Sequence, residues 1–379
     1  MAASICLAGG QVLTPEGTLE TADVHIAEGR IVDPPAASAS TRIDCRGYYV
    51  LPGIVDVHGD AFEHELHPRP GVDIAFAVAM RSVDRQLLAN GITTAFHGLT
   101  ISWEPGARSL AAGRRFMDAL QTLRQDLMVD HRVQLRWETF AHDVVNDLAR
   151  WLSLQPAPAL AFNDHTTSTM EKVKAGSHRK LGQWAERAGL TPEQYLAEVD
   201  AVSHRAPEVP AKIQAVAGQA RRQGVVMLSH DERSRDERVA YRDLGVSVCE
   251  FPLASEVAAD AVASGEHVIL GGPNVIRGGS HTGAMSAEAA IRDGLCTVLA
   301  SDYYYPSLLH AAEHLVGRGV LSFGEAWNLI SRNPAAAMRL QDRGLIAAGC
   351  RGDIVVIDAS GPWRLVHTIA GGTVTSFGY

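Results

Sequence analysis

Eight apolar runs, each ending at or beside polar residues, constrain the fold of this chain more than any other feature. They are Tyr49 to His58, Ile92 to His97, Val133 to Glu138, Ala159 to His165, Val225 to His230, Val246 to Glu250, His267 to Gly271 and Cys296 to Asp302. Continuous apolar runs are typical of parallel strands buried on both faces, and the stretches between them have helical periodicity. Because parallel strands need crossover helices, the pattern predicts an α/β fold, a (β/α)8 barrel of the TIM type.

The two chain ends are predicted to form a separate small β-sheet domain. Residues 4–14, 22–32, 353–358, 365–369 and 373–376 are strand-like. We therefore expect a composite β domain of residues 1–50 and 346–379 and a barrel of residues 51–345, a division that suits 379 residues. A long helical stretch at about 176–223 is predicted to be an insertion. It would be an excursion near the active-site face or a contact in a homo-oligomer.

Charge and cysteine content narrow the functional classes. With 34 basic and 43 acidic side chains the net charge is -9, which argues against binding to nucleic acid or to anionic membranes. The five cysteines are scattered without CxxC spacing, so we expect neither a disulfide framework nor a thiolate zinc site. No signal peptide or long apolar stretch is found. We expect a soluble, cytoplasmic protein, in which an anionic substrate would need local positive charge.

The first run leads into a histidine and a carboxylate whose side chains are expected on the same face of the strand. His58 and Asp60 follow the apolar stretch from Leu51 to Val57 at positions i and i+2. Alternate residues of a strand share a face, so both side chains could approach one metal ion from the barrel interior. The alternative is a strand-end histidine followed by a turn-forming aspartate, because such short motifs recur by chance.

Four more strand-end residues are candidate metal ligands. Glu138 would be costly to bury unpaired, and either a metal or a basic neighbour such as Arg136 would relieve that cost. His165 and His230 each follow an apolar run, where they are ligands or structural histidines. Asp302 ends the last run and could ligate a metal and accept a proton from water, or cap a helix.

The predicted ligand set contains three imidazoles, three carboxylates and no sulfur: His58, Asp60, Glu138, His165, His230 and Asp302. This set suits zinc, manganese, cobalt or iron(II) better than calcium or magnesium. His97 also ends a run, and we assign it a structural or supporting role because no further ligand is needed.

A glycine-rich segment is a candidate anion-binding loop. In residues 271–283, Gly278 and Gly279 permit close backbone approach, and Arg277 and His281 offer donors for phosphate oxygens. A tight connection between a strand and a helix is the alternative. The basic run Lys172, Lys174, His178, Arg179 and Lys180 could add positive charge or form an ordinary solvated helix face.

With these residues in place, the chain resembles the amidohydrolase superfamily from end to end. The resemblance lies in Gly29 to Val32, Leu51 to His58 and Arg343 to Val356. Within the superfamily the chain is more similar to the phosphonate-metabolism hydrolases of the carbon–phosphorus lyase pathway. The segments that carry this similarity are His58-Gly-Asp60, His67-Pro-Arg69-Pro-Gly-Val, Gly91-Ile-Thr-Thr, Asp164-His165, Ser229-His230-Asp231, Glu250-Phe-Pro, Pro273 to Gly283, Ser301-Asp-Tyr-Tyr, Asn333-Pro and Leu340 to Gly344.

The resemblance implies an activity and a role for each candidate residue. The six ligands would hold two divalent metal ions that activate a water, with Asp302 accepting the proton. Arg69, Arg277 and His281, with the backbone at Gly278 and Gly279, would hold a small anionic substrate. That substrate would be α-D-ribose 1-methylphosphonate 5-triphosphate or a related phosphorylated compound, cleaved to the 5-phosphate and pyrophosphate in phosphonate catabolism.

Some loops depart from that pattern, and two alternatives stay open. The superfamily's first strand has His-x-His where this chain has His58-x-Asp60, and the segments after His58 and His165 differ from those of the phosphonate branch. The superfamily also places its paired histidines on strands five and six, whereas the runs put them at four and five. The alternatives are a carbon–nitrogen hydrolase, acting on a cyclic amide or as a deaminase, and a non-catalytic subunit of a phosphonate-processing assembly.

Overall fold

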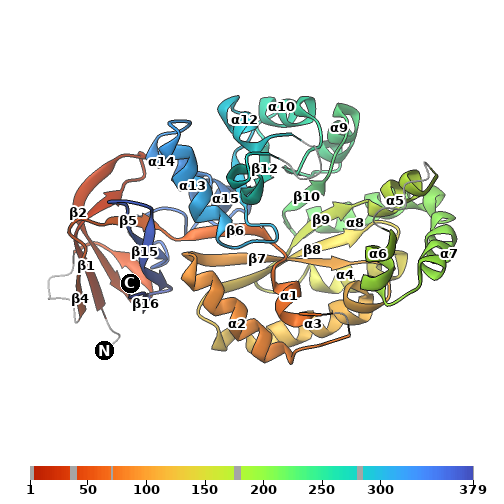
Figure 1. Cartoon of the computed structure of the whole chain (residues 1–379), viewed down its shortest axis with the longest axis horizontal. Coiled ribbons are helices and arrows are strands. Elements are labelled where there is room, and N and C mark those ends of the chain that lie inside the picture. The colour runs from red at the N-terminus through yellow and green to blue at the C-terminus, as the bar shows by residue number, and fades with distance from the viewer. Residues whose placement is uncertain (1–3, 35–40, 70, 175–180, 280–284, 379) are drawn as a thin grey trace.

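The computed structural model describes residues 4–34, 41–69, 71–174, 181–279 and 285–378. Two sheets organise this part of the chain, one at the centre of the larger body and one made from both chain ends (Figure 1). The predicted fold class is confirmed: a barrel of parallel strands with surrounding helices, and a separate small β-sheet domain. None of the described helices has the length and apolar character that a bilayer crossing needs.

Each of the eight predicted runs overlaps a strand of the barrel, although the second strand does not end at His97 as predicted but continues to Ile101. The strands are β6 (Ile54–Gly59), β7 (Ile92–Ile101), β8 (Asp130–Glu138), β9 (Ala159–Asn163), β10 (Met227–His230), β11 (Val248–Glu250), β12 (His267–Gly271) and β13 (Val298–Ala300). They pair in chain order, and each pair is parallel. All their carboxyl ends therefore meet at one rim, as the barrel geometry requires.

The first and last strands meet next to the candidate site. Gly59 and Asp302 form a parallel bridge between the ends of β6 and β13. The buried Asp56 carboxylate also accepts hydrogen bonds from the Ser301 backbone at 3.0 Å and the Ser301 hydroxyl at 2.6 Å. This closure fixes the relative positions of the strands that carry His58 and Asp302.

Fifteen helices connect and cover the strands in the described part of the chain. They are α1 (Phe62–Leu66), α2 (Phe76–Ala89), α3 (Leu110–Leu123), α4 (Val145–Trp151), α5 (His165–Lys174), α6 (Leu181–Ala188), α7 (Pro192–Ser203), α8 (Val209–Arg222), α9 (Arg235–Asp243), α10 (Ser255–Ala263), α11 (Gly272–Ile276), α12 (Ala287–Arg292), α13 (Ser307–Gly317), α14 (Phe323–Asn328) and α15 (Arg332–Ala337). Between β9 and β10 the chain forms α5 to α8, the region of the predicted insertion.

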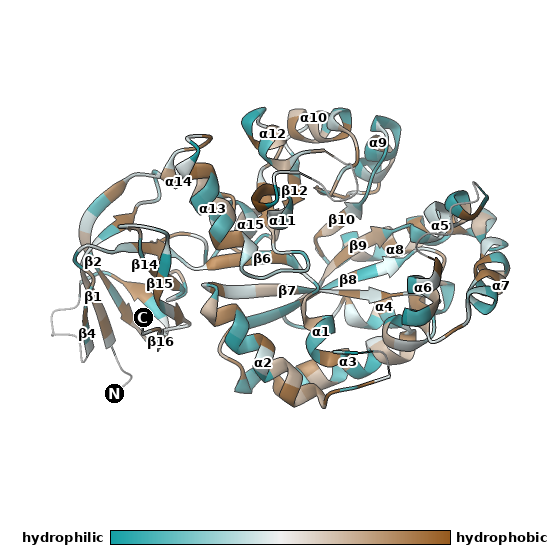
Figure 2. Cartoon of the chain, viewed as in Figure 1, coloured by the Kyte–Doolittle hydropathy of each residue, from teal (hydrophilic) through white to brown (hydrophobic). Residues whose placement is uncertain are grey.

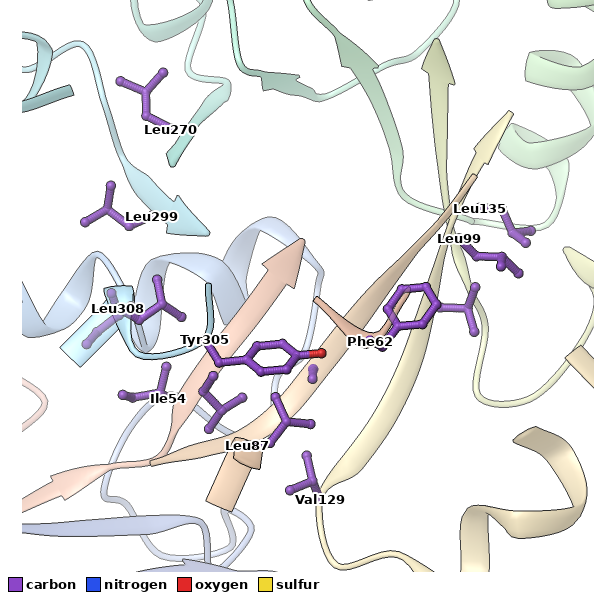
Figure 3. Close-up of a cluster of buried hydrophobic side chains, with 14 of the residues drawn as sticks. Ile54, Phe62, Leu87, Leu99, Val129, Leu135, Leu270, Leu299, Tyr305 and Leu308 are labelled. Atoms are coloured by element: carbon purple, nitrogen blue, oxygen red, sulfur yellow. The ribbon is translucent and has the colours of Figure 1, made fainter. Parts of the chain in front are cut away.

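The helices pack on the barrel through apolar stripes. In α2, Met80, Val83 and Leu87 are fully buried, at the spacing that places side chains on one helix face. Helix α9, in contrast, is largely hydrophilic (Figure 2), and the residue that it buries is Arg238. The largest buried cluster joins strand and helix side chains, including Ile54 and Leu87 (Figure 3). All five cysteines are buried, and each is a free thiol that forms no disulfide.

The terminal sheet contains strands from both ends of the chain. Its members are β1 (Ser4–Leu13), β2 (Leu19–Ala27), β3 (Arg30–Val32), β4 (Thr41–Asp44), β5 (Tyr49–Pro52), β14 (Ile354–Asp358), β15 (Arg364–Ala370) and β16 (Thr373–Ser376). The run from Tyr49 to His58 is therefore two strands in different sheets, β5 and β6, which Gly53 separates. The Gly53 amide donates to the Asp353 carbonyl at 2.8 Å, which ties this switch to the returning C-terminal segment.

Candidate metal centre

Histidines and carboxylates from several strand ends gather at the carboxyl rim of the barrel. They line a cavity of about 1150 Å³. Of the six predicted ligands, five line this cavity: His58, Asp60, His165, His230 and Asp302. Together with Asp231, which also lines the cavity, they form two groups of three, each with all ligand atoms within 4.8 Å of one another.

The first group joins the two ends of the barrel. His58 on β6 is 1% exposed, and Asp60 follows it by two residues. Asp302 follows β13 and completes the group. Reciprocal backbone hydrogen bonds of 2.9 Å, from the Asp302 amide to the His58 carbonyl and from the Asp60 amide to the Asp302 carbonyl, hold the three residues in register.

The second group contains the two later histidines and a neighbouring carboxylate, Asp231. The Asp231 carboxylate lies 3.7 Å from Nε2 of His230 and 4.0 Å from Nε2 of His165. His230 is the last residue of β10, and His165 is the first residue of α5, two positions after β9. Because all eight runs overlap barrel strands, the histidines belong to the fourth and fifth strands, as counted from the sequence.

One buried carboxylate accepts a hydrogen bond from a histidine of each group. Glu250, the last residue of β11, accepts hydrogen bonds from Nδ1 of His58 at 2.9 Å and from Nδ1 of His230 at 2.8 Å. Burial alone would raise the pKa of Glu250, but the charge of His58 and the hydrogen bond from His230 hold it below its ordinary value. With both Nδ1 atoms donating to Glu250, each ring keeps Nε2 as its acceptor nitrogen, the form a metal requires.

Glu138 has a different environment from the other predicted ligands. Its buried carboxylate accepts hydrogen bonds from the His165 amide at 3.0 Å, the Thr166 amide at 3.3 Å and the Thr166 hydroxyl at 2.7 Å, at the start of α5. Burial, and then the charge of Asp164, raises the pKa of Glu138 to about 8. Its carboxylate lies 3.7 Å from Nδ1 of His165. Glu138 belongs to none of the three-residue donor groups found among the described residues, so its role as a ligand stays a prediction.

The alternative partner of Glu138, Arg136, instead points into the site. Its guanidinium donates to Nε2 of His230 at 3.1 Å and lies 3.7 Å from the Asp60 carboxylate. Arg136 and Glu138 are two residues apart on β8, so both project from the same strand face.

Three of the strand-end residues adopt left-handed backbone conformations. Asp231, Phe251 and Asp302 have φ values of 60°, 52° and 57°. This region is uncommon for residues other than glycine and costs about 1–3 kcal/mol unless the surroundings enforce it. These residues directly follow β10 and β11 and come two positions after β13, and all three line the cavity.

Only some of the residues predicted to bind substrate line the large cavity. Arg277 and Gly279 line the large cavity, and Gly278 lies between them outside the lining. Arg69 is exposed and does not line it, so the structure does not bring this residue to the described site. His281 lies outside the described residues, as do His178, Arg179 and Lys180 of the basic run. Lys172 on α5 lines the cavity, whereas Lys174 does not.

The donor set fits two divalent cations. Neutral imidazole nitrogens and carboxylate oxygens, without thiolate, are suitable for zinc, manganese, cobalt or iron. The described lining of the cavity has seven carboxylates against four lysine and arginine side chains. Two divalent ions would reverse that excess of negative charge, which an anionic substrate would otherwise have to overcome.

Sequence analysis assigned no site role to Glu250 or Asp231 and treated Arg136 only as an alternative ion-pair partner. The signal for Glu250 was available, because this carboxylate ends the sixth apolar run just as Glu138 ends the third. Asp231 directly follows a predicted ligand. His97, given a structural or supporting role, is buried and hydrogen-bonds His131 through Nε2 at 2.8 Å.

Two curated proteins are similar to this chain over nine-tenths or more of its length. The chain is 29% identical over 353 residues to α-D-ribose 1-methylphosphonate 5-triphosphate diphosphatase from Escherichia coli (strain K12), covering 91% of this chain and 92% of the relative. It is 26% identical over 371 residues to an adenine deaminase from Methylobacterium sp. (strain 4-46), covering 94% of this chain and 55% of that relative.

Solved structures support the same architecture. A triazine hydrolase variant superposes with a TM-score of 0.65 at 16% identity, covering 98% of this chain and 94% of that one. Dihydropyrimidinase from Brevibacillus agri gives a TM-score of 0.62 at 13% identity, covering 99% and 95%. The sequence pattern of the amidohydrolase family matches residues 152–374. The chain therefore belongs to the amidohydrolase family.

Proposed function

We propose that this protein is a metal-dependent diphosphatase that releases pyrophosphate from α-D-ribose 1-methylphosphonate 5-triphosphate or a related phosphorylated compound. The observation that carries the proposal is the pair of three-residue donor groups at one cavity, with Glu250 orienting an imidazole of each. The relative from Escherichia coli, similar over nine-tenths of both chains, supports this substrate class.

The chain's own residues would perform three tasks in this reaction. His58, Asp60 and Asp302 would hold one divalent ion, and His165, His230 and Asp231 the other, with Glu138 a further candidate ligand. When bound, such ions supply Lewis acidity and lower the pKa of water. Asp302 would accept the proton of the water that adds across the phosphoanhydride bond. Arg277 would bind phosphate oxygens at the wall of the cavity.

A carbon–nitrogen hydrolase is the second candidate. The adenine deaminase relatives favour it, although the chain spans only 55% and 58% of their length. Such a substrate needs no anion-binding side chain, so Arg277 and Lys172 at the cavity wall would have no substrate charge to contact.

The test measures pyrophosphate release from the ribose triphosphate by protein reconstituted with metal. We expect rapid release by the wild type and a loss of about a thousandfold or more in Asp302→Asn, with the metal content of both measured in parallel. Asp143→Asn is the matched control, because Asp143 is an exposed partner of Arg205 and should leave turnover unchanged.

The outcomes separate the candidates. A wild-type protein that binds two metals per chain but releases no pyrophosphate would exclude the phosphonate proposal, and ammonia release from adenine or hydrolysis of cyclic amides would then identify the second candidate. A purified protein that retains no metal under any loading condition would favour the non-catalytic alternative.

A further inference from the structure

A second, smaller cavity lies beside the candidate metal centre. It has a volume of about 250 Å³ and lies between the end of β7, the 3-10 turn Gly106–Arg108 and helices α5, α6 and α7. Four residues line both cavities: His165, Ser168, Lys172 and Trp184. The smaller cavity, called the side cavity below, therefore shares a wall with the space above the metal-ligand candidates.

The side cavity has more positive than negative lining charge, in contrast to the large one. Its cations are Arg108, Lys172 and Arg187, and its carboxylates are Glu104 and Glu138. The excess of carboxylates in the large cavity is reversed here without any metal ion. Arg108 and Arg187 are each paired with a carboxylate, Glu63 and Glu104, so an anionic group would be held by their remaining N–H donors and by Lys172.

Each cation is held in place by a neighbour. Arg187 donates twice to Glu104, at 2.8 and 3.0 Å, and Arg108 donates to Glu63 at 3.0 Å. The ammonium of Lys172 donates to the Ser168 hydroxyl at 2.8 Å. Such partners orient the donors in advance, which lowers the entropy lost when a ligand binds.

Two buried polar atoms of the lining residues lack a partner within the described chain. They are Nε of Arg108 and the hydroxyl of Thr100, whose residue is only 4% exposed. Both atoms have almost no accessible surface, so they lie behind the cavity wall, and a ligand would be held by the charged side chains that line the cavity.

We propose that the side cavity binds the second anionic group of a substrate whose reacting group lies at the metal centre. This inference rests on the proposed function, since a ribose with a phosphonate at one end and a triphosphate at the other has two anionic ends. The volume supports it, because complete small-molecule pockets span about 300–1,000 Å³, and 250 Å³ suits one tetrahedral anion with part of a sugar. His165, in the shared wall, lies between the two ends of such a substrate.

The test uses the metal-loaded full chain and methylphosphonate as the probe. Calorimetric titration would compare the wild type with Arg187→Gln and Lys172→Met, and with Arg292→Gln as the control, since Arg292 is exposed on α12 and pairs with Glu288. We expect methylphosphonate to bind about tenfold more weakly to each side-cavity variant and unchanged to the control. Turnover of the ribose triphosphate should show a higher KM and little change in kcat in the same two variants.

Equal affinity for methylphosphonate in the wild type and both variants would overturn the inference, as would no binding to the wild type. Arg187 also holds Glu104, so its variant could fold poorly; Arg187→Lys keeps a cation there and should then bind methylphosphonate more tightly than Arg187→Gln. Lys172 lines both cavities, so a loss in Lys172→Met supports the side cavity only together with a loss at Arg187, which lines the side cavity alone. Because the binding measurement needs no turnover, the two proposals fail separately. A chain that releases no pyrophosphate but binds methylphosphonate through Arg187 would exclude the proposed reaction and support the side cavity.

Discussion

Arg136 donates a hydrogen bond to Nε2 of His230 across 3.1 Å, at the ring atom that a metal would use. Nδ1 of the same ring donates to Glu250, so Nε2 is the only acceptor the imidazole has left. A divalent ion bound to this nitrogen and the guanidinium therefore exclude each other. The positive charge of Arg136 also lies 3.7 Å from Asp60, a candidate ligand of the other group.

Replacing Arg136 should strengthen metal binding. Arg136→Gln removes a positive charge from the edge of the site and frees Nε2 of His230, so we expect metal affinity to rise by about tenfold or more. Competition with a chromogenic chelator measures the change. Arg132→Gln, four residues earlier on β8 and paired with Asp130, is the control and should leave affinity unaltered. Weaker binding in Arg136→Gln would mean instead that the guanidinium holds the ligands in position.

Removing the charge of Glu250 should weaken metal binding without direct contact to the metal. In Glu250→Gln the side chain can no longer accept hydrogen bonds from both imidazoles, so one ring loses its fixed tautomer and orientation. Partners of this kind are worth about 10- to 100-fold in metal affinity. The same chelator titration applies. Asp84→Asn is the matched control, because Asp84 is a buried carboxylate that pairs with His131 at 3.0 Å away from the site. Wild-type affinity in Glu250→Gln would contradict this assignment.

Much of the barrel could be predicted because its signals are local. Each apolar run overlaps a strand, and His58, His230 and Glu250, which end three of the runs, lie at or next to the end of a strand. His97 departs from this rule, because β7 continues past it to Ile101. The grouping of donor atoms could not be predicted, because it depends on side-chain directions that the left-handed residues after the strands set. Asp231, with φ of 60°, enters the second group in this way, whereas Glu138 is held by the start of α5.

The change of sheet at Gly53 also had no clear sequence signal. The residues on both sides are apolar, and hydrophobicity alone makes Tyr49 to His58 one strand. The pairing partner differs instead: β5 pairs with β14 from the far end of the chain, and β6 pairs with β7. Such nonlocal pairing is specified by tertiary packing.

An ion pair between β8 and the C-terminal segment should make stability depend on acid pH. Arg343 donates to Asp130 at 2.7 Å, and the side chains are 4% and 14% exposed. Burial alone would raise the pKa of Asp130, but Arg132 and Arg343 lower it to about 2. A carboxyl group whose pKa is lower in the folded chain stabilises the fold at pH values above its pKa in the unfolded chain, about 4. This stabilisation is lost as the pH falls toward 2.

Urea unfolding of Asp130→Asn should reveal that dependence. We expect the free energy of unfolding to fall by about 2 kcal/mol at neutral pH, and the difference from the wild type to shrink steadily below about pH 4. Asp143→Asn provides the exposed control, since its partner Arg205 and Asp143 are 37% and 67% exposed, and it should cost less than about 1 kcal/mol. A difference that is constant between pH 7 and 2.5 would contradict the role of the Asp130 charge.

The junction of the two sheets should not tolerate a side chain at Gly53. A Cβ there would lie 2.8 Å from Cγ2 of Thr93 and closer still to its hydroxyl, on the neighbouring strand β7. Gly53→Ala should therefore cost about 1–3 kcal/mol of unfolding free energy, because the strands on both sides of the junction are fixed by pairing. Gly317→Ala on α13 is the control, since no other atom lies within 4 Å of its added Cβ and alanine favours a helix.

A double variant separates this clash from a general loss of flexibility. Thr93→Ala removes the atoms nearest the new Cβ, so Gly53→Ala combined with Thr93→Ala should lose less stability than the sum of the two single changes. Additive costs would show that Gly53 is needed for its backbone freedom and not for the close approach of β7. Non-additivity would show instead that the close packing of Gly53 against Thr93 is what excludes a side chain at the start of β6, the strand that carries His58.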